Sequence, residues 1–205
     1  MPPEDRLVPR FAAEPPHEAE PGGRWAERLR EEFLEACAEV ELDEGQELGE
    51  IGEINWYPDR TWNGRVYLPA TASTTSGLEL FGFLAWERPD EGEPEICERR
   101  ASATTETADG NPDWQVDLCE EVVGSWRGET GKEAAMTLVW GRPLVRGAAI
   151  ATGELAGLCV DQCELSEDGL FTLLAPDDYR GDTLEIGCFD ARGREVARES
   201  LYEED

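Results

Sequence analysis

Residues 134–160 constrain the fold of this chain more than any other stretch. They read AAMTLVWGRPLVRGAAIATGELAGLCV, in which only two arginines and one glutamate are charged. The apolar residues do not follow helical spacing, and both faces of residues 135–140 are apolar or small, which is typical of a strand buried on two sides. Gly141 and Pro143 interrupt the run. We therefore expect two or three core strands here rather than a helix or a membrane span.

One amphipathic helix is expected over residues 24–41. Apolar residues recur there at intervals of three and four, while Glu and Arg occupy the opposite face. The stripe consists of Trp25, Leu29, Phe33, Ala36, Cys37 and Val40. A helix of this length, about 27 Å, is long enough to cover one face of a sheet.

The remaining apolar segments are short and separated by turn residues, which is typical of antiparallel strands. Asn63-Gly64 is a strong type I′ turn signal between two of them. Residues 111–126 would also suit a helix begun by Pro112, but we favour strands there. We expect strands at 51–57, 65–71, 78–86, 96–107, 114–118, 122–126, 170–175, 184–189 and 195–201. The prediction is a mainly β fold, an antiparallel β-sandwich or barrel (one large or two small) with one N-terminal amphipathic helix.

Three segments are expected along the chain. Residues 1–23 form an extended arm rich in Pro and Glu, in which Leu7, Val8 and Phe11 are the candidate anchors of an interaction arm; the alternative is a disordered tail. Residues 24–94 form the helix and a β meander. Residues 95–205 form the sandwich or barrel portion, and one continuous domain over 24–205 is the alternative.

The charge of the chain limits its partners. Its 47 acidic and 18 basic residues give a net charge of −29, and clusters of Lys and Arg that would bind phosphates are absent. We expect no nucleic acid and no membrane as partner, but a protein partner or self-association. The first residues contain no apolar signal segment, so a cytoplasmic location with reduced thiols is expected.

Common catalytic constellations are absent from the sequence. His17 is the only histidine and it lies in the arm, so no Ser-His-Asp triad, Cys-His pair or His-ligated zinc site is expected within the folded part. Glycine-rich phosphate-binding loops are absent too. We expect a protein that is not an enzyme and has no cofactor, with calcium as the one alternative.

Asp177, Asp178 and Asp182 are the residues that suggest calcium. They form the densest carboxylate cluster beside an expected turn, and oxygen-rich loops of this kind bind calcium. The spacing is not that of an EF-hand, and a solvated loop is the preferred interpretation.

Cys159 and Cys163 are the only close cysteine pair, and we expect two buried thiols rather than a redox or metal pair.

Four aromatic residues flank the expected hairpin around Asn63: Trp56, Tyr57, Trp62 and Tyr67. On one exposed face they would stack on sugar rings, which suggests a carbohydrate-binding module or a carboxylate-based glycosidase. The preferred alternative is that they fill the core under the helix.

Gly124-Ser125-Trp126 resembles the short Gly-x-Trp signature of the lipocalin family, but it lies later in the chain than that signature does. We transfer no property of that family to this chain on these three residues. A lipocalin-like barrel that binds a small apolar ligand is nevertheless a third possibility. The function that we favour is that of a non-catalytic acidic β protein acting through protein–protein contacts, as a structural or assembly subunit.

Overall fold

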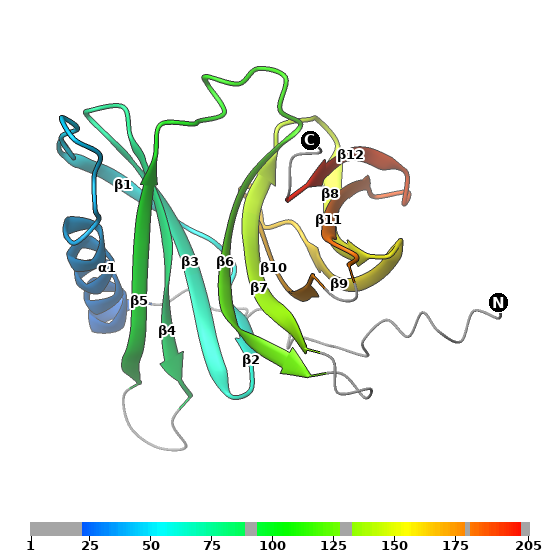
Figure 1. Ribbon diagram of the computed structural model, residues 1–205, viewed down its shortest axis with the longest axis horizontal. Coiled ribbons are helices and arrows are strands. Elements are labelled where there is room, and N and C mark those ends of the chain that lie inside the picture. Colours follow the sequence, from blue (N-terminus) through cyan, green and yellow to red (C-terminus); the bar gives the residue numbers. More distant parts are fainter. Residues whose placement is uncertain (1–21, 89–93, 128–132, 179–180, 202–205) are drawn as a thin grey trace. The chain divides into compact units, whose positions relative to one another are not determined.

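The structure, a computed structural model, describes residues 22–88, 94–127, 133–178 and 181–201 (Figure 1). These residues form antiparallel sheets and a single α-helix, which confirms the mainly β fold. The chain divides into two compact units between Asp113 and Trp114. We call the described residues before this division the helix unit and those after it the sandwich unit.

This division falls later than the boundary expected after residue 94. Strand β5 (Glu95–Thr104), which the sequence analysis assigned to the second portion, pairs along its length with β4 (Glu79–Glu87). The antiparallel ladder between them runs from Glu79↔Thr104 to Glu87↔Glu95. Because these hydrogen bonds make β5 part of the first sheet, the helix unit extends beyond residue 94.

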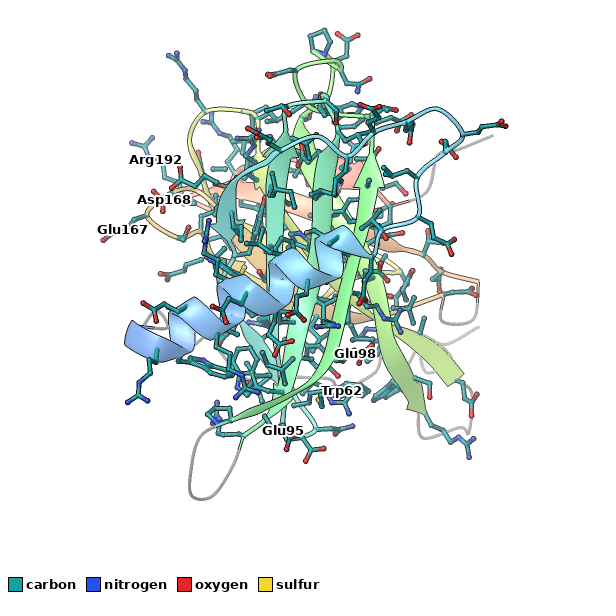
Figure 2. All side chains as sticks on the ribbon, turned by 90° about the vertical axis from the view of Figure 1, so that its left-hand side faces the viewer. Trp62, Glu95, Glu98, Glu167, Asp168 and Arg192 are labelled. Carbon is teal, nitrogen blue, oxygen red and sulfur yellow. The ribbon has the colours of Figure 1, made fainter. Side chains whose placement is uncertain are left out.

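The helix unit consists of one sheet and α1 (Gly23–Ala38), which crosses its strands on one face (Figure 2). The strands are ordered β1-β3-β4-β5, and β2 also pairs with β3. Besides β4 and β5, the sheet contains β1 (Ile51–Trp56), β2 (Arg60–Trp62) and β3 (Arg65–Thr74). Asn63 and Gly64 join β2 to β3 with φ of 50° and 76°, as a type I′ turn requires.

The apolar stripe of α1 packs on the sheet as the sequence predicts. Leu29, Phe33 and Cys37 are at most 1 % exposed, and the ring centroids of Phe33 and Trp56 are 5.7 Å apart. An ion pair also joins the helix to the sheet, because Arg99 of β5 donates from Nη1 to Glu32 Oε2 at 3.2 Å. The helix is thus held by a buried apolar seam with charged contacts at its margin.

The sandwich unit contains two sheets with strand orders β10-β7-β6 and β12-β11-β8-β9. One buried cluster contains residues from both sheets, among them Val139, Phe171, Leu184 and Ile186. The strands are β6 (Val116–Arg127), β7 (Glu133–Pro143), β8 (Ala148–Leu155), β9 (Leu158–Glu164), β10 (Phe171–Asp177), β11 (Leu184–Asp190) and β12 (Glu195–Ser200). The described strands form a sandwich and not a closed barrel.

The stretch at residues 134–160 supplies an inner strand to each sheet of this sandwich. Strand β7 lies between β10 and β6, and β8 lies between β11 and β9. Met136, Leu138, Val139 and Trp140 are all fully buried. The two-faced apolar pattern of the sequence therefore has the expected cause, which is burial on both sides of an inner strand.

Two glycines allow close approach between paired strands. A Cβ atom on Gly82 of β4 would lie 2.0 Å from the backbone oxygen of Arg100, and one on Gly141 of β7 would lie 2.1 Å from that of Asp117. Only a residue without a side chain fits beside these carbonyl groups.

In the part of the chain that the structure describes, no helix is long and apolar enough to cross a membrane.

Candidate functional site

The four aromatic residues expected near the hairpin do not share a face. Trp56 packs with the core under α1, and its partner across the ladder is Ala70 of that same core. Tyr67 projects to the opposite face, where its ring lies 5.9 Å from that of Phe83. Tyr57 and Tyr67 are buried, at 7 % and 2 % exposed. The structure therefore forms no exposed platform from these four residues.

Trp62 is the one of the four that remains half-buried without packing in the helix core. It lies opposite Arg65 on the hairpin, and Arg65 Nη1 donates to Glu98 Oε2 at 3.2 Å. Trp62 and Glu98 lie toward the same end of the sheet, to one side of α1 (Figure 2). A single indole beside an ion pair offers one stacking surface at most.

The three aspartates proposed for calcium have different environments. Asp177 is 1 % exposed, and its Oδ1 accepts hydrogen bonds from the backbone N–H groups of Asp178 and Leu184, both at 2.8 Å. Asp178 and Asp182 are exposed. Asp177 thus holds the start of β11 against the end of β10. Among the described residues no group of three His, Cys, Asp or Glu side chains is placed to hold a metal ion.

Cys159 and Cys163 project from opposite sides of β9. Cys163 is buried, whereas Cys159 is exposed, and all six cysteines are free thiols. The expectation of two buried thiols is thus wrong for Cys159, because a register shift in the β8–β9 ladder places it opposite Glu154 on the outer face. Burial raises the pKa of the Cys159 thiol, and the negative charges of Glu154 and Asp161 raise it further. The thiol is therefore a poor nucleophile.

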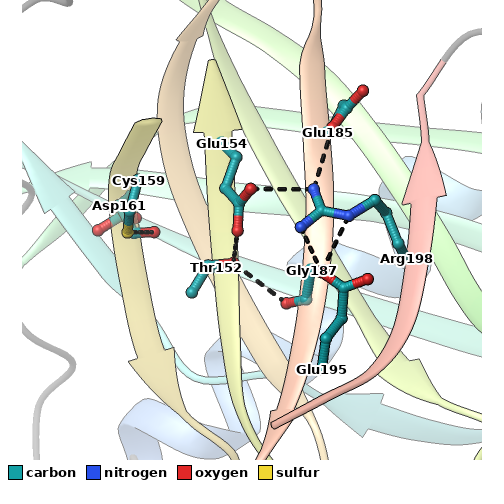
Figure 3. Close-up of polar contacts among 8 residues, drawn as sticks. All are labelled: Thr152, Glu154, Cys159, Asp161, Glu185, Gly187, Glu195 and Arg198. Atoms are coloured by element: carbon teal, nitrogen blue, oxygen red, sulfur yellow. Dashed lines mark hydrogen bonds and ion pairs between the residues drawn. The ribbon is translucent and has the colours of Figure 1, made fainter. Parts of the chain in front are cut away.

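A polar network covers the outer face of the four-stranded sheet (Figure 3). Arg198 on β12 donates from Nη1 to Glu154 Oε2 at 2.9 Å and to Glu185 Oε2 at 3.0 Å, and it also contacts Glu195. Thr152 Oγ1 donates to Glu154 Oε1 at 3.0 Å. These charge-assisted hydrogen bonds join β8, β11 and β12 on that face.

One edge of the three-stranded sheet is open among the described residues. Strand β6 pairs with β7 on one side and with no other described strand on its second side. Its residues 118–122 lie before a bulge at Val123, where the register with β7 shifts. We name Leu118, Glu120 and Val122, which alternate along this stretch, the β6 edge.

Two contacts show that the backbone groups of the β6 edge point away from β7. The Gln115 carbonyl accepts a hydrogen bond from the N–H of Leu144 at 2.8 Å, and the Asp117 oxygen lies against Gly141. The odd-numbered residues therefore bond to β7. Since backbone groups alternate in direction along an antiparallel strand, the N–H and C=O groups of Leu118, Glu120 and Val122 point outward.

The side chains of the β6 edge differ from an ordinary solvated strand. Val122 is 52 % exposed, while Leu118 packs against the sandwich core. Between them, Glu120 Oε2 is buried and accepts no hydrogen bond from the described residues. Burial raises the pKa of the Glu120 carboxyl, and the charges of Asp177 and Glu121 raise it further. The edge thus combines backbone groups that pair with no other described strand, an apolar side chain and a buried carboxylate oxygen without a hydrogen bond among the described residues.

The sequence analysis did not single out this edge. Val122 and Val123 were expected only as the start of a strand over residues 122–126, and Glu120 is one of 47 acidic residues. The only sequence signal for a binding edge was the pair Glu120-Glu121 followed by Val122-Val123. This signal could be interpreted only once the order of the strands was known.

Comparisons with protein-family models, with curated proteins and with solved structures found no match for this chain.

Proposed function

We propose that this protein is a non-catalytic acidic β protein that acts through protein–protein contacts, as a self-associating structural or assembly subunit. The observation that carries the proposal is the β6 edge, where outward-pointing backbone groups adjoin the half-exposed Val122. An unpaired edge strand is a template on which another chain can add a strand.

The charge of the chain favours a particular partner chemistry. A protein with a net charge of −29 repels nucleic acid and other anionic partners, and attracts segments that carry arginine. Glu120, whose Oε2 is buried without a hydrogen bond among the described residues, would gain most from such a segment. The partner expected at this edge is an extended segment with both apolar and basic residues.

Light scattering coupled to size-exclusion chromatography tests the proposal on the full chain. We expect an oligomer whose dissociation is promoted by Val122→Asp, because a charge at this position opposes strand addition. The matched control is Leu158→Asp, since Leu158 is 49 % exposed and begins β9, an edge strand that lies beside β10. A monomeric wild-type chain at every concentration would contradict the proposal, as would equal effects of the two substitutions.

A further inference from the structure

We propose that the β6 edge binds the arm segment of residues 6–11 from a second copy of this chain, as an added antiparallel strand. This inference rests on the proposed function and names the partner of the edge. Residues 6–11 read RLVPRF and lie outside the described residues. The candidate anchors Leu7, Val8 and Phe11 from the sequence analysis all belong to this segment.

The side chains of the arm segment match those of the β6 edge. In an extended segment Arg6, Val8 and Arg10 project to one face, because side chains alternate along a strand. The β6 edge presents Glu120 and Val122 on one face in the same alternation. When Val8 lies opposite Val122, antiparallel pairing places Arg10 opposite Glu120. The segment thus supplies an apolar contact for the exposed valine and a cation for the buried carboxylate oxygen.

Pro9 of the arm segment also suits a strand added at this edge. In this pairing the backbone groups of Arg6, Val8 and Arg10 point toward β6, so those of Pro9 point away from it. Proline has no N–H group and is tolerated in a strand where that group would face solvent. The segment therefore suits a position at the new edge of the sheet, and its Pro9 would stop the addition of further strands.

The arm segment fits the β6 edge in length and in charge. The stretch from Val116 to Val122 is regular and ends at the bulge, so it accommodates a segment of this size. The acidic chain has few segments with a positive charge, and RLVPRF carries two arginines and no acid. Exchange of arms between two copies uses the same edge twice, which gives a closed, symmetric dimer.

Amide hydrogen exchange on the full chain, resolved residue by residue by NMR, is the direct test. Without a bound strand, the outward amides of Leu118, Glu120 and Val122 would exchange as solvent-exposed groups. With the arm bound, we expect them to exchange about tenfold more slowly or better. The amides of Cys119 and Glu121, which point toward β7, serve as an internal reference because arm binding leaves their partners unchanged.

The discriminating variant is Arg6→Glu together with Arg10→Glu. It should abolish the added protection of the three outward amides and weaken the dimer, whereas the control Ala12→Glu with Ala13→Glu should leave both unchanged. Glu120→Gln, which keeps the shape of the side chain, should reduce the protection by removing the charge pair.

Each other outcome overturns the inference. Protection that is the same in the wild type and the arm variant would exclude the arm as occupant. Arm-dependent protection in a monomer, independent of protein concentration, would show that each copy binds its own arm. An oligomer that survives the arm variant would leave the proposed function standing and refute this partner, whereas a monomeric wild type would refute the proposed function itself.

Discussion

Asp161 Oδ2 on β9 accepts a 2.8 Å hydrogen bond from the backbone N–H of Leu174 on β10. The two residues belong to different sheets of the sandwich unit, and both are buried. A carboxylate thus satisfies an edge N–H group on the side of β10 where no described strand pairs. The bond closes one side of the sandwich, where β9 and β10 lie next to each other.

Asp161→Ala should therefore destabilise the sandwich unit by about 1–3 kcal/mol, because the Leu174 N–H would be left buried without an acceptor. Asp161→Asn keeps an acceptor oxygen and should lose less. Urea unfolding and the exchange rate of the Leu174 amide measure the effect. Glu164→Ala, at an exposed position of the same strand, is the control; an effect as large as that of Asp161→Ala would contradict this role.

Gly82→Ala and Gly141→Ala should each destabilise the protein by about 3 kcal/mol, near the upper end for overpacking. The added methyl group would meet backbone oxygens at 2.0 Å and 2.1 Å, so paired strands would have to separate. Gly153→Ala is the matched control in β8, since its nearest neighbour would be Leu184 Cδ1 at 3.5 Å. Thermal unfolding should show a lower Tm for the first two variants only.

Phe33→Ala should undock α1, because the side chain is fully buried between helix and sheet. Loss of a buried phenylalanine costs about 3–5 kcal/mol. Arg99→Ala should cost less, since its contacts with Glu32, Glu35 and Glu39 are partly exposed and screened by salt. Helix content by circular dichroism, measured at low and high salt, separates the two. A larger effect of Arg99→Ala would reverse this order.

The six thiols should react at distinct rates with a disulfide reagent. Cys97 is exposed and should react first, followed by Cys159, whose pKa is raised by burial and by neighbouring carboxylates. Burial raises the pKa of Cys37 and of Cys188 to about 11. At pH 8 about one in a thousand of these two thiols is therefore ionised.

The reaction of Cys37 and Cys188 should accelerate as pH rises toward 11, or on unfolding. Cys97→Ser should remove the fastest phase without changing the others. Rapid labelling of Cys188 in the folded protein at neutral pH would contradict its burial.

The local elements of this fold could be predicted from the chain because each has a local cause. The spacing of Trp25, Leu29 and Phe33 favours a helix with one apolar face, and the structure has it, although α1 ends at Ala38, before the expected Glu41. Asn63-Gly64 favours a tight turn because both residues tolerate positive φ. The two-faced apolar pattern of residues 135–140 indicated an inner strand, and β7 is one; β8, from the same apolar stretch, is the other.

Two strands were not delimited from the sequence, although a third core strand within residues 134–160 was one of the expectations. β2 has only three residues, too few to show a period. β9 contains Asp161 and Gln162 in its middle, and a polar pair lowers the signal of a buried strand. The burial of Asp161 makes sense only beside Leu174, which lies in another sheet.

By itself, then, the sequence determined the class of fold, the single helix and the inner strands, since periodicity and turn chemistry act between near neighbours. Strand order and register were decided by tertiary structure. They separated Trp56 from Tyr67, buried Asp177 against backbone N–H groups, and exposed Cys159. They also left β6 at an edge. Such outcomes depend on pairing between distant residues, and one shift of register moves a side chain to the other face of its sheet.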